Sequence, residues 1–145
     1  MDERRTATNE TSRSGHPVSD HPDPADLGSQ PASEEPVERF ELSTLQAEQL
    51  VAGKPYLEFL RRGQLSAGLY VLDAGADDLQ QPHTEDEVYH VLEGQAVLEV
   101  DGQQRSVKPG STVFVAAGIA HRFHSVAAQL VVLVIFAPAE GSRSR

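Results

Sequence analysis

Two histidines and one glutamate in the second half of the chain are the residues best suited to hold a metal ion. His83 and Glu87 lie four positions apart, and His121 follows Glu87 after a further 34 positions. Two imidazoles and one carboxylate form a facial ligand set that leaves coordination positions open for water, substrate or dioxygen. The surrounding sequence is rich in β-branched residues and interrupted by glycines, so strand curvature and barrel closure must bring the three side chains together.

The elements that must position these residues are expected to be short strands. Alternation of apolar and polar residues predicts strands at residues 56–60, 69–72, 88–92, 96–100, 112–115 and 130–136. Dipeptides that end in glycine separate them, and Asp101-Gly102 between two alternating runs is typical of a hairpin. Many short strands with frequent turns are characteristic of a β-sandwich or a small barrel.

The chain before the strands has a different composition. Residues 1–37 are rich in Pro, Ser, Thr, Asp and Glu and hold almost no large apolar residue, which predicts a disordered acidic arm. Residues 41–52 carry leucines at helical spacing, with Ser43 as the predicted N-cap and Gly53 as the stop. We therefore expect an arm at 1–37, one barrel domain at 38–139 and a flexible tail at 140–145.

Composition and charge exclude several classes of function. The chain has 145 residues and no cysteine, which indicates a single domain without disulfides, thiol nucleophiles or thiolate metal sites. A net charge of −10 argues against nucleic acids and anionic membranes as partners. The first residues contain no apolar stretch, and the run at 130–137 is too short to span a bilayer. We therefore expect a cytoplasmic protein.

The segment around the first histidine resembles the first motif of the cupin superfamily. The motif begins at Gly75, places His83 and Glu87 at the family's ligand spacing, and ends at Gly94. Gln81 stands where the family has its first histidine.

The segment around His121 resembles the second cupin motif. It begins at Gly110 and includes Gly118 before the histidine. Ala116 replaces the family's proline, and Ser125 replaces its asparagine. The resemblance covers about residues 56–138 and is closest to the small single-domain bacterial cupins.

The resemblance implies an all-β fold, the cupin double-stranded β-helix or jelly-roll barrel, here with a short N-terminal helix and the disordered arm. With Glu87 facing inward, Tyr89 also faces inward and His90 outward. With His121 inward, Phe123 faces inward too. The five aromatic residues that we assign to the core or the cavity wall are Phe59, Tyr70, Phe114, Phe123 and Phe136. Four carboxylates are expected at a solvated rim, namely Asp77, Asp78, Glu85 and Asp86.

The resemblance also implies a metal site formed by His83, Glu87 and His121, with a divalent ion such as Fe, Mn, Zn or Ni. Gln81 would be a fourth, weaker ligand or a hydrogen-bond donor to bound water or substrate, since an amide binds a transition metal less strongly than imidazole does. The alternative is a barrel without metal that keeps these residues as a buried hydrogen-bond network.

We predict a metal-binding cupin acting as a mononuclear metal-dependent enzyme of the oxygenase or isomerase type on a small organic molecule. The alternative is a non-catalytic cupin that binds or senses a small molecule without metal. Cupins commonly dimerise by extending their sheets, so the resemblance also implies a homodimer.

Overall fold

Strands dominate the computed structural model, which describes residues 35–143. Its elements are α1 (Leu42–Ala52), β1 (Tyr56–Arg61), β2 (Ser66–Leu72), β3 (Asp86–Glu93), β4 (Ala96–Val100), β5 (Gln103–Val107), β6 (Thr112–Val115), β7 (His121–His124) and β8 (Leu130–Ala137). The predicted arm, residues 1–37, lies almost entirely outside the described residues, as do the last two residues of the chain.

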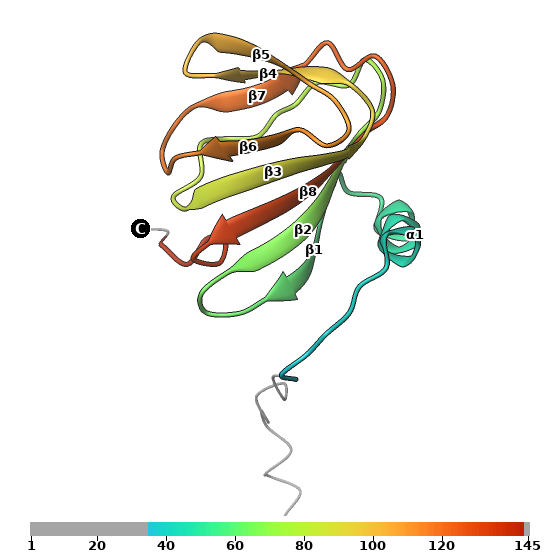
Figure 1. Cartoon of the computed structure of the whole chain (residues 1–145), viewed down its shortest axis with the longest axis vertical. Coiled ribbons are helices and arrows are strands. Elements are labelled where there is room, and N and C mark those ends of the chain that lie inside the picture. The colour runs from blue at the N-terminus through green and yellow to red at the C-terminus, as the bar shows by residue number, and fades with distance from the viewer. Residues whose placement is uncertain (1–34, 144–145) are drawn as a thin grey trace, which may run out of the picture. The chain divides into compact units, whose positions relative to one another are not determined.

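The eight strands form two antiparallel sheets, as Figure 1 shows. One sheet has the order β1-β2-β8-β3-β6, and the other has the order β5-β4-β7. Neighbouring strands are in several cases distant in sequence: the last strand, β8, lies between β2 and β3. This arrangement confirms the predicted all-β jelly-roll barrel with one short helix.

The core lies between the two sheets and follows the period of two along the strands. On β3, Glu87, Tyr89 and Val91 are buried, while the alternate residues are partly exposed. From the smaller sheet, Leu98 and Phe123 are buried against the same cluster. The predicted inward and outward faces of β3 and β7 are therefore confirmed.

The helix α1 packs on the outer face of the larger sheet. Leu45 of α1 contacts a second cluster made by Leu69 and Val71 of β2 and Val131 of β8. Strands β2 and β8 are covered on both faces in this region, which explains their nearly continuous apolar sequences. The helix ends at Gly53 in the left-handed conformation, as predicted, but Glu41 and not Ser43 is the N-cap.

The predicted strand ranges did not include β5 and β7, although the Asp101-Gly102 hairpin and the alternation at His121 and Phe123 implied strands there. Four of the five residues of β5 are exposed, and β7 reads His-Arg-Phe-His, so neither shows a run of apolar residues. One aromatic assignment was wrong: Phe114 is 62% exposed. It is paired with the outward Val88 across β3 and β6, so the alternation along β6 turns Phe114 away from the core.

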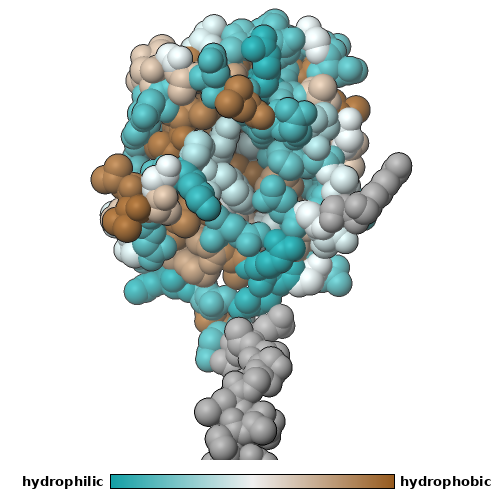
Figure 2. Space-filling model, turned by 180° about the vertical axis from the view of Figure 1, so that it is seen from behind, coloured by the Kyte–Doolittle hydropathy of each residue, from teal (hydrophilic) through white to brown (hydrophobic). Residues whose placement is uncertain are grey.

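The surface is largely hydrophilic, with separate hydrophobic patches (Figure 2). Exposed apolar side chains on α1 are Leu50 and Val51, and Phe114 and Ile135 are exposed on the strands. Within residues 35–143, no helix is long and apolar enough to cross a membrane.

Candidate metal site

The three predicted ligands meet inside the barrel. His83 Nδ1 lies 3.1 Å from Glu87 Oε2, and His121 Nε2 lies 3.1 Å from the same oxygen. Glu87 and His121 are buried, and His83 is partly buried. One ligand atom from each of the three residues lies within 4.8 Å of the others. The structure thus brings together residues that the sequence separates by up to 38 positions.

Glu87 is held in the middle of the larger sheet. It stands on β3 opposite Val115 of β6 and Phe136 of β8. Because β3 is paired here with a strand on each side, its backbone orientation is fixed. The side chain of Glu87 therefore points toward the interior.

The two histidines reach the site from different segments that are tied together by the main chain. The N–H of Gly118 donates to the carbonyl oxygen of His83 at 2.7 Å. Gly118 has a positive φ of 77°, which forms the turn that leads into β7. His121 is the first residue of β7, on the smaller sheet. The site therefore includes ligands from both sheets.

Hydrogen bonds determine which ring nitrogen of His121 is available. Its Nδ1 lies 2.8 Å from the carbonyl oxygen of Ile119, and because a carbonyl only accepts, Nδ1 must carry the proton. In neutral His121, Nε2 then presents a lone pair toward Glu87. A carbonyl acceptor behind the ring is a common way of orienting a metal-binding histidine.

The hydroxyl of Tyr89 is oriented by a second chain of hydrogen bonds. Gln80 Nε2 donates to Asp78 Oδ2 at 2.6 Å, which turns Gln80 Oε1 toward Tyr89. The Tyr89 hydroxyl donates to that oxygen at 2.9 Å. Its own oxygen lies 3.0 Å from His121 Nε2. Tyr89 therefore directs a lone pair, and not its proton, toward His121.

Burial and close contacts shift the pKa values of these groups in opposite directions. Burial opposes ionisation of Glu87, but contacts with His121 and His83 outweigh it and hold the pKa of Glu87 below its ordinary value. Burial likewise opposes protonation of His121, but Glu87 and the Ile119 carbonyl raise the pKa of the imidazole. Burial raises the pKa of Tyr89, so the phenol keeps its proton.

The site has the electronic character of a cation site. When His121 is neutral, its Nε2 and Glu87 Oε2 converge as acceptors beside the Tyr89 oxygen. Glu87 Oε2 and His83 Nδ1 are buried without a hydrogen-bond partner among the described residues, despite their short contact. Metal bonds of about 2.1 Å at a right angle place two ligand atoms about 3.0 Å apart, close to the two separations of 3.1 Å. The residues present therefore fit a divalent ion.

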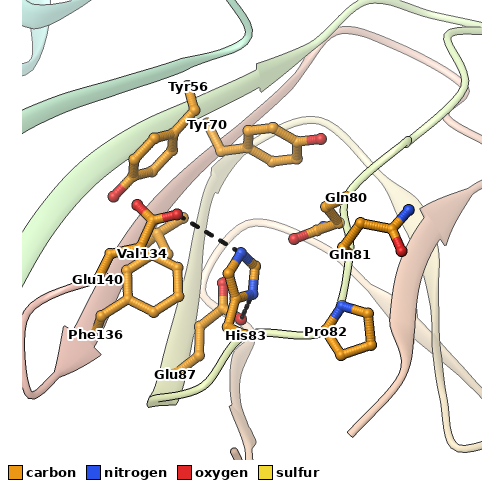
Figure 3. A pocket seen from close by; sticks show the side chains of 10 residues that line it. All are labelled: Tyr56, Tyr70, Gln80, Gln81, Pro82, His83, Glu87, Val134, Phe136 and Glu140. Atoms are coloured by element: carbon orange, nitrogen blue, oxygen red, sulfur yellow. Dashed lines mark ion pairs between the residues drawn. The ribbon is translucent and has the colours of Figure 1, made fainter. Parts of the chain in front are cut away.

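Gln81 is not part of this cluster in the structure. It is exposed and lies at the edge of the cavity, on a segment outside the strands. Figure 3 shows its amide directed away from His83, whereas the amide of the neighbouring Gln80 points toward the cavity. Gln81 as a fourth ligand stays a prediction, and Gln80 is a residue that the sequence analysis missed.

Two carboxylates predicted at a solvated rim have other surroundings. Glu85 is only 1% exposed. One of its oxygens contacts the Thr84 hydroxyl, and the other has no hydrogen-bond partner within the described region. Glu85 lies in the bend that immediately precedes β3, where the strand period does not apply. Asp78 accepts hydrogen bonds from the Tyr70 hydroxyl and the Phe123 N–H and so secures the segment that leads to His83.

A cavity of about 370 Å³ opens beside His83 and Glu87 (Figure 3). His83 and Glu87 line it, together with Tyr56, Tyr70, Gln80, Gln81, Pro82, Val134, Phe136 and Glu140. Glu140 Oε1 lies 3.8 Å from His83 Nε2. Burial raises the pKa of Glu140, and His83 opposes the shift. The sequence analysis placed Glu140 in a C-terminal tail and assigned no role to Tyr56, because nothing in their spacing relates them to the motifs.

Comparison with known families and sequences gives a consistent result. A family model described as a cupin domain matches residues 68–136, which include all three candidate ligands. An uncharacterized protein of Streptomyces coelicolor is 48% identical over 101 residues, which cover 70% of this chain and 96% of that protein.

Solved structures share the fold. An RmlC-like cupin from Shewanella frigidimarina has a TM-score of 0.53 at 22% identity, covering 61% of this chain and 77% of that one. The DMSP lyase DddQ from Ruegeria pomeroyi has a TM-score of 0.51 at 25% identity, covering 58% of this chain and 42% of the lyase.

Proposed function

The chain belongs to the cupin superfamily, and on that premise we propose that it binds one divalent metal ion through His83, Glu87 and His121. We further propose that a small organic molecule reacts at this ion in an oxygenase- or isomerase-type reaction. A bound ion would supply Lewis-acid or dioxygen chemistry at this position.

The observation that supports metal binding most strongly is the convergence of Glu87, His83 and His121 inside the barrel. Glu87 Oε2 lies within 3.1 Å of a nitrogen from each histidine. When neutral, His121 directs a lone pair inward because its other nitrogen donates to the Ile119 carbonyl. Glu87 Oε2 and His83 Nδ1 have no hydrogen-bond partner among residues 35–143. Buried polar atoms without partners typically cost about 1–3 kcal/mol each, and one cation would satisfy both.

The remaining residues of the site are suited to bind and orient an organic ligand. The cavity continues directly from His83 and Glu87, so a ligand in it lies against the proposed metal position. Tyr89 stays protonated, and its oxygen lies 3.0 Å from His121 Nε2, next to the proposed metal position. The cavity volume of about 370 Å³ is within the range typical of small-molecule sites.

The test is the metal content of the full chain purified without chelator, followed by chelator titration. We expect about one divalent ion per chain, and Glu87→Gln should weaken binding by about tenfold or more because it removes the only anionic ligand. Glu99→Gln is the matched control, since Glu99 pairs with Arg122 outside the ligand set, and it should leave the affinity unchanged.

Turnover tests under air then separate an enzyme from a binding protein. If the chain binds none of Fe, Mn, Zn and Ni, the metal-dependent function is wrong. A non-catalytic small-molecule-binding cupin then takes its place, with the three residues serving as a hydrogen-bonded network in which His121 is protonated.

A further inference from the structure

The lining of the cavity beside the candidate metal site combines aromatic rings with carboxylates. The rings are those of Tyr56, Tyr70 and Phe136 (Figure 3). Their centroids are 6.2 Å apart for Tyr56 and Phe136 and 6.4 Å for the two tyrosines. The carboxylates are those of Glu87 and Glu140. A ligand that fits must therefore combine an apolar part with a polar group.

The charge of the lining is one-sided. The described residues that line the cavity include two carboxylates and no lysine or arginine. The nearby guanidinium of Arg61 is already engaged, since it donates to Glu58 and to the main-chain carbonyl of Glu140 at 2.8 Å each. No fixed positive side chain is therefore available to neutralise an anionic ligand on the Glu140 side.

The hydroxyl of one of these rings, that of Tyr56, is buried and has no hydrogen-bond partner among the described residues. Figure 3 shows this hydroxyl and the carboxylate of Glu140 on the same side of the cavity. A polar ligand atom between them would bond to both, and the cost of an unsatisfied buried hydroxyl would be removed.

The position of the Tyr56 ring is set by a glycine. A Cβ atom at Gly68 would lie 2.2 Å from the ring and 2.3 Å from the hydroxyl oxygen. Gly68 is on β2, directly opposite Glu58 and two positions before Tyr70, which pairs with Tyr56. The missing side chain makes room for the ring to lie flat along the strand, so this wall of the cavity is a built feature.

We infer that this cavity takes a small molecule with an apolar or aromatic skeleton and a hydroxyl or ammonium group, and that it rejects anions of the same size. The ligand's polar group donates to Glu140 and bonds to the Tyr56 hydroxyl, while its apolar part packs against the rings. An ammonium group gains further from the aromatic faces. The inference rests on the proposed function, because it names the substrate class of the same site.

The test uses three probes with one skeleton and different charges: benzylamine, benzyl alcohol and benzoate. Binding to the full chain, dialysed against chelator, is followed by NMR shifts of amides in the lining. We expect benzylamine and benzyl alcohol to bind, with benzylamine at least about tenfold tighter than benzoate. Equal binding of benzoate, or no saturable binding of any probe, overturns the inference.

Variants of Glu140 identify the source of the selectivity. Glu140→Lys should invert the order of benzylamine and benzoate, and Glu140→Gln should abolish the preference if the lysine variant does not fold. Glu48→Lys makes the same charge change on exposed α1 and should leave the order intact. An unchanged order in both Glu140 variants refutes the inference.

The two proposals fail separately. The probes are measured without metal, so their order depends only on side chains of the chain itself. If the selectivity is found but the chelator titration detects no metal binding, the proposed function fails and the inference stands. If metal binds and the probes show no selectivity, the inference fails and the proposed metal binding stands.

Discussion

Gly94 offers a quantitative test of the packing between the end of β3 and the start of β8. It lies between β3 and β4 with a φ of +84°. A Cβ atom there would lie 2.3 Å from the carbonyl oxygen of Gln129 and 2.8 Å from Cα of Leu130. Both contacts are with main-chain atoms, and Leu130 is fully buried at the start of β8. Neither neighbour can move without shifting the strand.

The expected cost of Gly94→Ala has two parts. A left-handed conformation costs alanine about 1–2 kcal/mol. Overpacking against main chain adds about 1–3 kcal/mol, for a total of about 2–5 kcal/mol. Gly102→Ala is the matched control, because Gly102 has a similar φ of +78° but nothing within 4 Å of the added Cβ. Gly102→Ala should therefore incur only the cost of the left-handed conformation, about 1–2 kcal/mol.

The assay is thermal or urea unfolding of both variants beside the original chain. For a domain of this size 1 kcal/mol corresponds to about 4–8 °C in Tm. Gly102→Ala should therefore lower Tm by roughly 4–15 °C, and Gly94→Ala by several degrees more. An equal decrease in Tm for the two variants would show that the close approach of Gly94 to β8 does not affect stability, and it would refute the reasoning.

Two further predictions concern the ligands. If Gln81 is a weak fourth ligand, Gln81→His should tighten metal binding by about tenfold or more in a competitive chelator titration; an unchanged affinity would show that position 81 keeps its outward orientation. In the metal-free chain, the pKa of His121 is raised above its ordinary value of 6.5. The stability that this shift contributes is fully present below pH 6.5 and is lost as the pH rises through the raised pKa. The lowered pKa of Glu87 contributes stability above its ordinary value of 4.5. With chelator present, the free energy of unfolding should be higher at about pH 5.5 than at about pH 8, and this difference should be smaller in Glu87→Gln. A difference as large as that of the original chain would contradict the assignment.

The parts of the fold that the sequence predicted are those in which burial follows a simple period. Along β3, inward Glu87 requires inward Tyr89 and Val91, and the structure has this pattern. The Asp101-Gly102 turn also follows from local chemistry, since both residues have positive φ between β4 and β5. The same period would have placed Phe114 outward on β6, so this error came from applying a residue preference in place of the alternation. Glu85 lies in a bend before β3, where no strand period predicts its burial.

The parts that were missed depend on contacts between distant segments. Glu140 and Tyr56 stand 84 positions apart, and they share the cavity because β8 pairs with β2 and β2 pairs with β1. Gln80 contributes because Asp78 and Tyr89 fix its amide. Neither relation follows from spacing, since each arises only when the sheets close.

The distribution of the ligands over both sheets links metal binding to the stability of the fold. Glu87 belongs to the five-stranded sheet and His121 to the three-stranded one. The main-chain bond from Gly118 to His83 is one of the contacts that hold the third ligand close to His121. Separation of the sheets would disperse all three, so an ion bound here favours only the closed barrel. By linkage, metal at about 100 times its Kd stabilises such a state by about 2.7 kcal/mol. That is a large share of a typical domain's stability of about 5–15 kcal/mol, so a chain that binds metal as proposed must also resist unfolding better when metal is present.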